Sequence, residues 1–405
     1  MIENPYIRVA TSYLKKVEKP LMSKDTVEIL IPWNKDTIIS DHGKDYLSKI
    51  PCFDGFCCIP SHINYQQQIG TFYNQYYELK YKPKAGDCSL TLEFIRHIFQ
   101  SQYEIGLDYL KILYEHPHQI LPILCLVSSE RGTGKTTFLN FLKMIFDKNM
   151  TLNTNDDFRS QFNSDWANKL IIAIDEVLLD KREDSERIKN LSTARQFKAE
   201  AKGKDRQEIE FFGKFILCSN NETSFIYLDK EEIRYWVIQV PPFCESLKNK
   251  LDTLMDILKS EIPMFLYFLI NREYSTQKQS RMWFTPKQIE TKALFRLKQS
   301  NTSFVEREIA DILFYILERR ELDKVQFQIQ DIVISMENRR VRKSISYSDI
   351  QSVVKTNWGL ISKNSSYTKY IICYDGEIIS SVQKGRFYTI TKLFLIENFV
   401  DLLNL

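Results

Sequence analysis

The stretch Ser129-Glu130-Arg131-Gly132-Thr133-Gly134-Lys135-Thr136-Thr137 lies between an apolar run at 123–127 and a segment, 138–145, whose apolar residues recur at helical spacing. It nearly matches the pattern G-x-x-x-x-G-K-[ST], in which backbone N–H groups wrap a phosphate at the start of a helix. Ser129 stands where the pattern has its first glycine. The order of strand, loop and helix therefore predicts a phosphate-binding loop.

The residue types in this loop suit a nucleotide with a metal ion. Lys135 is predicted to reach the β- and γ-phosphates, and Thr136 to offer its hydroxyl to Mg²⁺. We expect all nine residues of 129–137 to contribute to an ATP site. A chance G-x-G-K-T-T in a turn is the alternative, and it is weakened because two further elements follow in order.

The second element is Lys169-Leu-Ile-Ile-Ala-Ile-Asp175-Glu176, a buried-type strand that ends in two carboxylates. Asp175 is predicted to hold the Mg²⁺ through water. Glu176 is predicted to polarise the attacking water as the general base. Alone, a strand that ends in Asp-Glu is weak evidence, but its position after the loop strengthens it.

The third element is Phe215-Ile-Leu-Cys-Ser219-Asn220-Asn221, another apolar run that ends in amides. Asn220 is predicted to orient the lytic water and sense the γ-phosphate. The alternative is that the two asparagines only form a turn, as is common after a strand.

Apolar runs that alternate with helical stretches predict an α/β fold with a largely parallel sheet flanked by helices. Ligands bind beyond the carboxyl ends of such strands, so the three elements are expected at one edge. From about residue 303, helical stretches precede a β-rich part, which suggests a winged helix. We divide the chain into an N-terminal region of unassigned role, a helical lead-in, the nucleotide-binding core, a helical lid-like segment and a winged-helix-like domain, at 1–88, 89–119, 120–245, 246–300 and 301–405.

The composition indicates a soluble protein. Charged residues make up 26% of the 405, and the longest apolar run, 262–270, is too short to span a bilayer. No secretory signal is visible, so we expect a cytoplasmic protein without a membrane partner. The net charge of +3 is too small to diagnose nucleic-acid binding, so DNA contacts must come from local basic patches. Those patches contain Lys202, Lys204, Arg206, Arg339, Arg340, Arg342 and Lys343.

The order and compact spacing of the three elements resemble the superfamily 3 helicases, in particular the phage and plasmid primase-helicase branch of the AAA+ class. The resemblance covers roughly residues 90–245. It implies an AAA+ type P-loop fold and a homohexameric ring that threads single-stranded DNA. It also implies that the segment 197–206, which contains the basic residues at 202–206, is a hairpin facing the pore. Arg234 resembles the family's arginine finger, which reaches the γ-phosphate of a neighbouring subunit, and a surface ion pair with Glu231 or Glu232 is the alternative.

The resulting expectation is an ATP- and Mg²⁺-dependent replicative DNA helicase encoded by a mobile element in a bacterial host. Two alternatives stay open: an ATPase that remodels protein or acts in defence without unwinding, and an ATP-switched initiator that binds duplex origin DNA through its C-terminal domain. Only about 90 residues precede the core, and they contain no convincing D-x-D pair. Primase activity is therefore not expected in this chain, and a separate primase is a candidate partner. For the basic run 339–343, a solvated helix end is as well supported as DNA contact.

Overall fold

A computed structural model describes most of the chain, and it divides into two compact units. The described residues are 4–20, 26–160, 163, 166–179, 182–199, 207–228, 231–300, 304–339 and 345–399. Unit 1 comprises 1–226 and 232–294, and unit 2 comprises 227–231 and 295–405. The division into five parts expected from the sequence stays a prediction.

A five-stranded sheet forms the centre of unit 1. Its strands lie in the order β14-β8-β13-β10-β9, and every neighbouring pair is parallel. The three central strands are entirely buried, as their uninterrupted apolar sequences lead one to expect for a sheet covered on both faces. The predicted α/β fold with a parallel sheet flanked by helices is thus confirmed. The strands are β8 (Ile123–Val127), β9 (Met150–Asn153), β10 (Ile171–Ile174), β13 (Lys214–Ser219) and β14 (Tyr235–Gln239).

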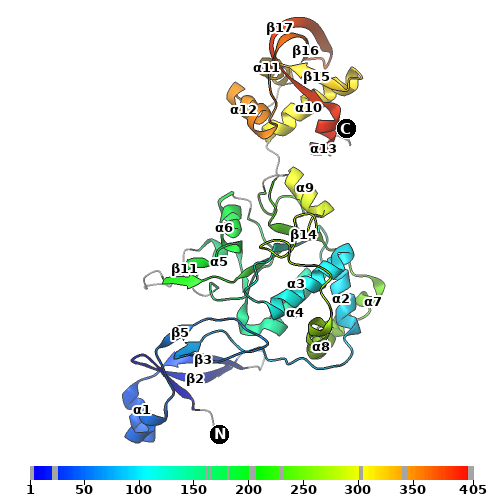
Figure 1. Ribbon diagram of the computed structural model, residues 1–405. Helices are drawn as coiled ribbons and strands as arrows, with labels where there is room; N and C mark the ends of the chain where they lie inside the picture. Colours follow the sequence, from blue (N-terminus) through cyan, green and yellow to red (C-terminus); the bar gives the residue numbers. More distant parts are fainter. Residues whose placement is uncertain are drawn as a thin grey trace. The chain divides into compact units, whose positions relative to one another are not determined.

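Helices α2, α3, α4 and α8 pack against one another beside this sheet (Figure 1). Their apolar faces form the main core together with the sheet, and Phe138, Phe141 and Phe265 are fully buried there. The helices of this part of the chain are α2 (Ser89–Phe99), α3 (Tyr103–Glu115), α4 (Lys135–Phe146), α5 (Asn155–Arg159), α6 (Arg182–Ser192), α7 (Glu245–Lys248), α8 (Leu251–Asn271) and α9 (Lys292–Ser300), with 3₁₀ turns at Gln100–Gln102 and Asp147–Asn149.

Smaller sheets complete unit 1, and the N-terminal ones were not predicted. Four strands lie in the order β3-β2-β1-β4, and three more in the order β5-β7-β6. Strands β11 and β12 form an antiparallel hairpin. The bounds are β1 (Tyr6–Val9), β2 (Ser12–Pro20), β3 (Thr26–Pro32), α1 (Lys35–His42), a 3₁₀ turn (Lys44–Lys49), β4 (Cys52–Phe53), β5 (Gly55–Cys57), β6 (Gln68–Ile69), β7 (Phe72–Asn74), β11 (Gln196–Ala199) and β12 (Gln207–Glu210).

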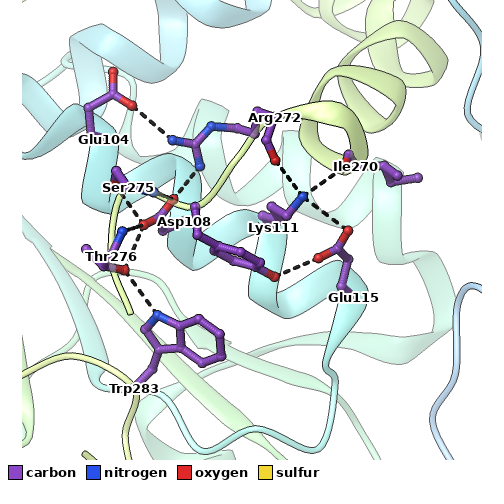
Figure 2. A network of polar contacts seen from close by, with 10 residues as sticks. Glu104, Asp108, Lys111, Glu115, Ile270, Arg272, Ser275, Thr276 and Trp283 are labelled. Carbon is purple, nitrogen blue, oxygen red and sulfur yellow. Dashed lines mark hydrogen bonds and ion pairs between the residues drawn. The ribbon is translucent and has the colours of Figure 1, made fainter. Parts of the chain in front are cut away.

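A buried carboxylate on α3 anchors the segment that follows α8 (Figure 2). Asp108, which is 0% exposed, accepts hydrogen bonds from the guanidinium of Arg272 and from the backbone N–H and hydroxyl groups of Ser275 and Thr276. Thr276 in turn accepts a hydrogen bond of 3.1 Å from the indole of Trp283. The carboxylate is therefore fully paired, as a buried charge must be.

A lysine one turn further along α3 holds the end of α8 (Figure 2). The ammonium of Lys111 donates to the backbone oxygens of Ile270 and Arg272 at 2.7 and 2.8 Å. It also pairs with Glu115 at 3.2 Å. Cations at a helix C-terminus satisfy its last carbonyls and interact favourably with its dipole. Residues 272–283 thus have a defined path over α3.

Unit 2 has a core of its own beneath a three-stranded antiparallel sheet in the order β15-β17-β16. Asp331 is buried there, where it accepts a hydrogen bond of 2.9 Å from Tyr367 and pairs with Lys369 at 3.2 Å. The elements are α10 (Phe304–Arg319), β15 (Lys324–Phe327), α11 (Ile329–Asn338), α12 (Tyr347–Ser352), a π-helical turn (Val353–Asn357), β16 (Lys363–Ile372), β17 (Ile378–Thr391) and α13 (Lys392–Asn398). Within the described parts of the chain, no helix combines the length and the apolar character that a membrane span requires.

The Asp108 network predicts a large stability effect. Asp108→Ala should lower the free energy of unfolding by about 3–5 kcal/mol, because Arg272 would keep only the exposed Glu104 as a partner and the donors of Ser275 and Thr276 would lose their buried acceptor. Urea unfolding measures this. Glu104→Ala is the matched control, since Glu104 pairs with the same arginine but its side chain is 62% exposed, and exposed pairs contribute about 0–1 kcal/mol. Equal losses in the two variants would contradict the anchoring role.

Candidate nucleotide-binding site

The loop between β8 and α4 turns on two glycines with left-handed backbone. Gly132 has a φ of +66° and Gly134 a φ of +94°, a region that side chains disfavour. A Cβ on Gly134 would lie 2.7 Å from Cζ of Phe243, whereas the space around Gly132 is open. Helix α4 then begins at Lys135, so its free N–H groups face the loop.

An open cavity of about 460 Å³ lies over this loop at the carboxyl edge of the parallel sheet. It unites the three sequence elements, because the strands that carry them are parallel neighbours. Ser129 and Glu130 do not line it. The lining residues are Arg131, Gly132, Thr133, Gly134, Lys135, Thr136, Thr137, Asp175, Glu176, Ser219, Asn220, Phe243 and Leu251.

The side chain of Lys135 lies folded across the loop. Its ammonium donates to the hydroxyl of Thr133 at 3.2 Å and to the backbone oxygen of Glu130 at 3.4 Å. Burial lowers the pKa of Lys135, while the nearby carboxylates of Asp175 and Glu222 oppose that shift. A bound phosphate would replace the two neutral acceptors with charged ones, which make stronger hydrogen bonds to an ammonium.

Thr136 and Asp175 present the oxygen atoms that a hard divalent cation prefers. The Thr136 hydroxyl donates to the Asp175 carboxylate at 2.8 Å. Magnesium typically keeps several waters and takes one or two protein ligands together with substrate phosphates. Across the described ranges, no cluster of three or more His, Cys, Asp or Glu side chains could hold a metal. This pair fits a cation that arrives with a nucleotide.

Glu176 is held in an unfavourable backbone conformation at the end of β10. Its φ of +54° lies in the left-handed region, which is uncommon for a residue other than glycine. The Asn155 side chain donates to the Glu176 backbone oxygen at 3.3 Å and accepts from the Leu178 backbone at 3.0 Å. The exposed Glu176 side chain lines the cavity.

The two asparagines after β13 have different surroundings. The Asn221 side chain accepts hydrogen bonds from the backbones of Thr223 and Ser224 at 3.0 and 2.9 Å, so it forms a turn. Asn220 lines the cavity beside Ser219. Of the two side chains, that of Asn220 is placed to meet a ligand.

Arg234 lies away from the cavity of its own chain. It immediately precedes β14, at the amino edge of the sheet, and its guanidinium donates to both oxygens of Glu232 at 3.0 and 3.1 Å. Glu232 is buried and also pairs with Lys189 at 3.5 Å. The arginine thus has an intramolecular partner, and its action on a neighbouring subunit stays a prediction.

Three residues that support the loop were missed in the sequence. The Glu222 carboxylate accepts a hydrogen bond of 2.7 Å from the backbone of Ser129 and two of 3.0 Å from the side chain of Gln239. His97 interacts with the Thr133 backbone oxygen at 2.9 Å, and its ring stacks on Phe243 at 4.7 Å. Only the position of Glu222, shortly after the third strand, offered a signal. His97 and Phe243 belong to distant segments that packing brings together.

The predicted DNA-contact residues are mostly not assessed by the structure. Lys202, Lys204 and Arg206 lie outside the described residues, as do Arg340, Arg342 and Lys343. Arg339 caps α11, is exposed, and places its guanidinium 5.8 Å from the centre of the Tyr315 ring. DNA contact by these residues stays a prediction.

The chain is similar to a protein family of unknown function and to a phage DNA primase-polymerase. A family of unknown function, DUF5906, matches residues 126–234. A DNA primase-polymerase of Nitratiruptor phage NrS-1 is 30% identical over 138 residues, which span 33% of this chain and 19% of that protein. Apo structures of the NrS-1 C-terminal region are similar in fold, with TM-scores of 0.65 and 0.63, at 14% and 15% identity over 95% of both chains.

These findings overturn the helicase interpretation. The resemblance to superfamily 3 helicases, the ATP-hydrolysing DNA helicase activity and the helicase, ATPase and P-loop descriptions drawn from it are wrong, because the relative is a DNA primase-polymerase. The physical reason is that the loop and its acidic pair report only a phosphate-binding arrangement, which many nucleotide-using proteins share. The comparisons give no support to a hexamer or to a separate primase.

The two glycines of the loop predict different costs for the same substitution. Gly132→Ala should destabilise the fold by about 1–2 kcal/mol through its left-handed backbone alone. Gly134→Ala should cost more, since its methyl group also meets the Phe243 ring. Thermal unfolding of the two variants measures the difference. Equal losses of stability in the two variants would mean that the Phe243 ring can move aside without cost and does not fix the conformation of the loop.

Proposed function

We propose that unit 1 binds a nucleoside triphosphate together with a divalent cation, and that the chain acts in DNA replication of the primase-polymerase type. One observation carries the first part: loop 131–137, Asp175 and Asn220 line a single cavity. The relative from phage NrS-1 supports the second part. The matched segment spans only 19% of that protein, so the relative's activity is a proposal for this chain. We also propose that the chain acts in the cytoplasm of a bacterium that carries the phage or a similar mobile element.

ATP with Mg²⁺ is the ligand that we propose for the cavity. The backbone N–H groups at the start of α4 would receive the phosphate chain, as helix N-termini do for anions. Lys135 would turn from Thr133 and the Glu130 carbonyl to the outer phosphates. Thr136 and Asp175 would hold the cation, which neutralises the phosphate charge. Ser129 and Glu130, outside the cavity, would act by shaping the loop.

Glu176 and Asn220 have proposed roles at the terminal phosphate. The Asn220 amide would donate a hydrogen bond to an oxygen of the terminal phosphate, and the Glu176 carboxylate would accept one from a water molecule bound beside it. A backbone conformation that costs of order 1–3 kcal/mol is often retained at functional sites, and Glu176 has one. Arg234 would enter only from another copy of the chain, since its own cavity lies at the other edge of the sheet.

DNA is the macromolecular partner that we propose. Three helices followed by a long β-hairpin in unit 2 support a winged-helix-like domain, with Arg339 and the basic residues after it as contacts. Phosphate contacts by these cations would be salt-dependent and insensitive to sequence.

Lys135→Ala should abolish nucleotide binding. At a ligand concentration of about 100 times Kd, ATP with Mg²⁺ should stabilise the parent chain by about 2.7 kcal/mol. The variant should show no shift, because its loop lacks the phosphate-binding charge. Thermal unfolding with ATP, other nucleoside triphosphates and the deoxy forms measures both binding and base preference.

A second lysine variant distinguishes loss of the binding site from a general loss of positive charge. Lys143→Ala removes a lysine two turns further along the same helix, outside the cavity lining, and should leave nucleotide binding intact. Asp175→Asn should keep binding but weaken its dependence on Mg²⁺. A parent chain that shows no nucleotide-dependent shift with any triphosphate would refute the site. Incorporation of labelled nucleotides on a single-stranded template, with parent or Lys135→Ala chains in the reaction, tests the replication role.

A further inference from the structure

A second cavity, of about 380 Å³, opens at the opposite edge of the parallel sheet. Its walls come from residues 118–120 before β8, from the base of the β11–β12 hairpin, and from residues 278–281 after α8. β8 and β13 run parallel, and the cavity is lined by residues that precede each of them. It therefore lies at the amino edge, whereas the candidate nucleotide site lies at the carboxyl edge.

The lining of this cavity is basic. Arg195, Lys278 and Arg281 contribute exposed side chains, and Glu210 contributes the one carboxylate. None of the three cations forms an ion pair with any residue that the structure describes. Cations gathered in a recess and left without acidic partners attract anions.

Two phenylalanines give the cavity an apolar wall. Phe211 and Phe212 are each 7% exposed, so only a small part of each ring is open to the cavity. The backbone of Phe211 donates to the Arg195 oxygen at 2.9 Å, which joins the aromatic wall to one of the cations.

The segment that carries Lys278 and Arg281 is fixed from two sides. The Gln119 side chain donates to the backbone oxygen of Arg281 at 2.7 Å. The Asp108 network holds Ser275 and Thr276 at the start of the same segment (Figure 2). The cations are therefore presented on a backbone that is already ordered, which lowers the entropic cost of binding.

A buried lysine lies directly behind the wall. The Lys214 ammonium donates to the backbone oxygens of Phe212, at 2.6 Å, and of Pro117. No described carboxylate lies within ion-pair distance of it, and burial lowers the pKa of Lys214 to about 7. An anion in the cavity would favour its charged form, so this group adds to the positive potential.

We propose that this cavity binds phosphodiester groups of single-stranded nucleic acid. Positive grooves with aromatic neighbours track the backbone of single strands. A free triphosphate fits less well, because the lining contains no glycine loop at a helix N-terminus and no hydroxyl–carboxylate pair for a cation. The proposal rests on the proposed action on DNA, and it assigns a site that contains none of the basic residues 202–206 or 339–343.

Removal of the three cations tests the proposal. The triple variant Arg195→Gln, Lys278→Gln and Arg281→Gln should bind a fluorescent oligo(dT) at least tenfold more weakly at low salt. Each phosphate contact to a single strand contributes about 0.7 to the slope of log affinity against log salt concentration. The loss of three contacts should reduce that slope by about two. Fluorescence anisotropy over a KCl series measures both quantities.

A charge-matched variant is the control. Lys35→Gln, Lys44→Gln and Lys49→Gln remove the same number of charges from exposed positions in and after α1, and should leave the slope unchanged. If both triple variants lost the same affinity for oligo(dT), the effect would come from net charge alone and the proposed site would be wrong. An unchanged cavity variant, a parent chain that binds no oligo(dT), or a loss confined to duplex DNA would overturn it as well. ATP binding and the unfolding midpoint of the cavity variant should match the parent, which separates this site from the nucleotide site.

Discussion

The parallel alignment of β8, β10 and β13 is the constraint on which the rest of the structure depends. Ladder pairs such as Ile174 with Leu217 and Ser219 with Val127 bring three carboxyl ends to one edge. The loop, the acidic pair and the amide after β13 come together only because these registers hold. A slip of one residue would turn every buried side chain of a strand to the opposite face. Because these strands are apolar on both faces, their sequences alone do not specify the register. Packing against the helices that cover the sheet must fix it.

The sequence predicted this part of the molecule well because its signals are local. A buried strand followed by glycines and a lysine specifies a turn and a helix start within about ten residues. Asp175 and Asn220 follow their strands directly, so the topology of a parallel sheet was enough to bring them together. In contrast, Glu222, His97 and Phe243 support the loop through contacts between distant segments, and no periodicity reports such contacts.

The function was predicted less well than the fold. The chemistry predicted for residues 129–137 and Asp175 concerns phosphate and metal, and it would be the same whichever process used a nucleotide. The step from that chemistry to DNA unwinding came from the order and spacing of motifs, and the primase-polymerase relative contradicts it. Most of the N-terminal strands escaped prediction because they are short, and two of them contain only two residues each. The nine-residue β2 escaped because charged residues interrupt its apolar positions. The Asp108 network escaped for another reason: its members lie more than 160 residues apart.

Strand β13 begins with Lys214 beside the basic cavity and ends with Ser219 beside Asn220. Its six residues, at about 3.3 Å each, separate the two edges by about 20 Å. A buried strand that is hydrogen-bonded to neighbours on both sides keeps a constant length, because a change in length would break those hydrogen bonds. A mononucleotide is too short to span that gap. Molecules bound at the two edges would therefore not overlap sterically. If binding at one edge changed the affinity at the other, the change would have to be transmitted by the packed strands of the sheet.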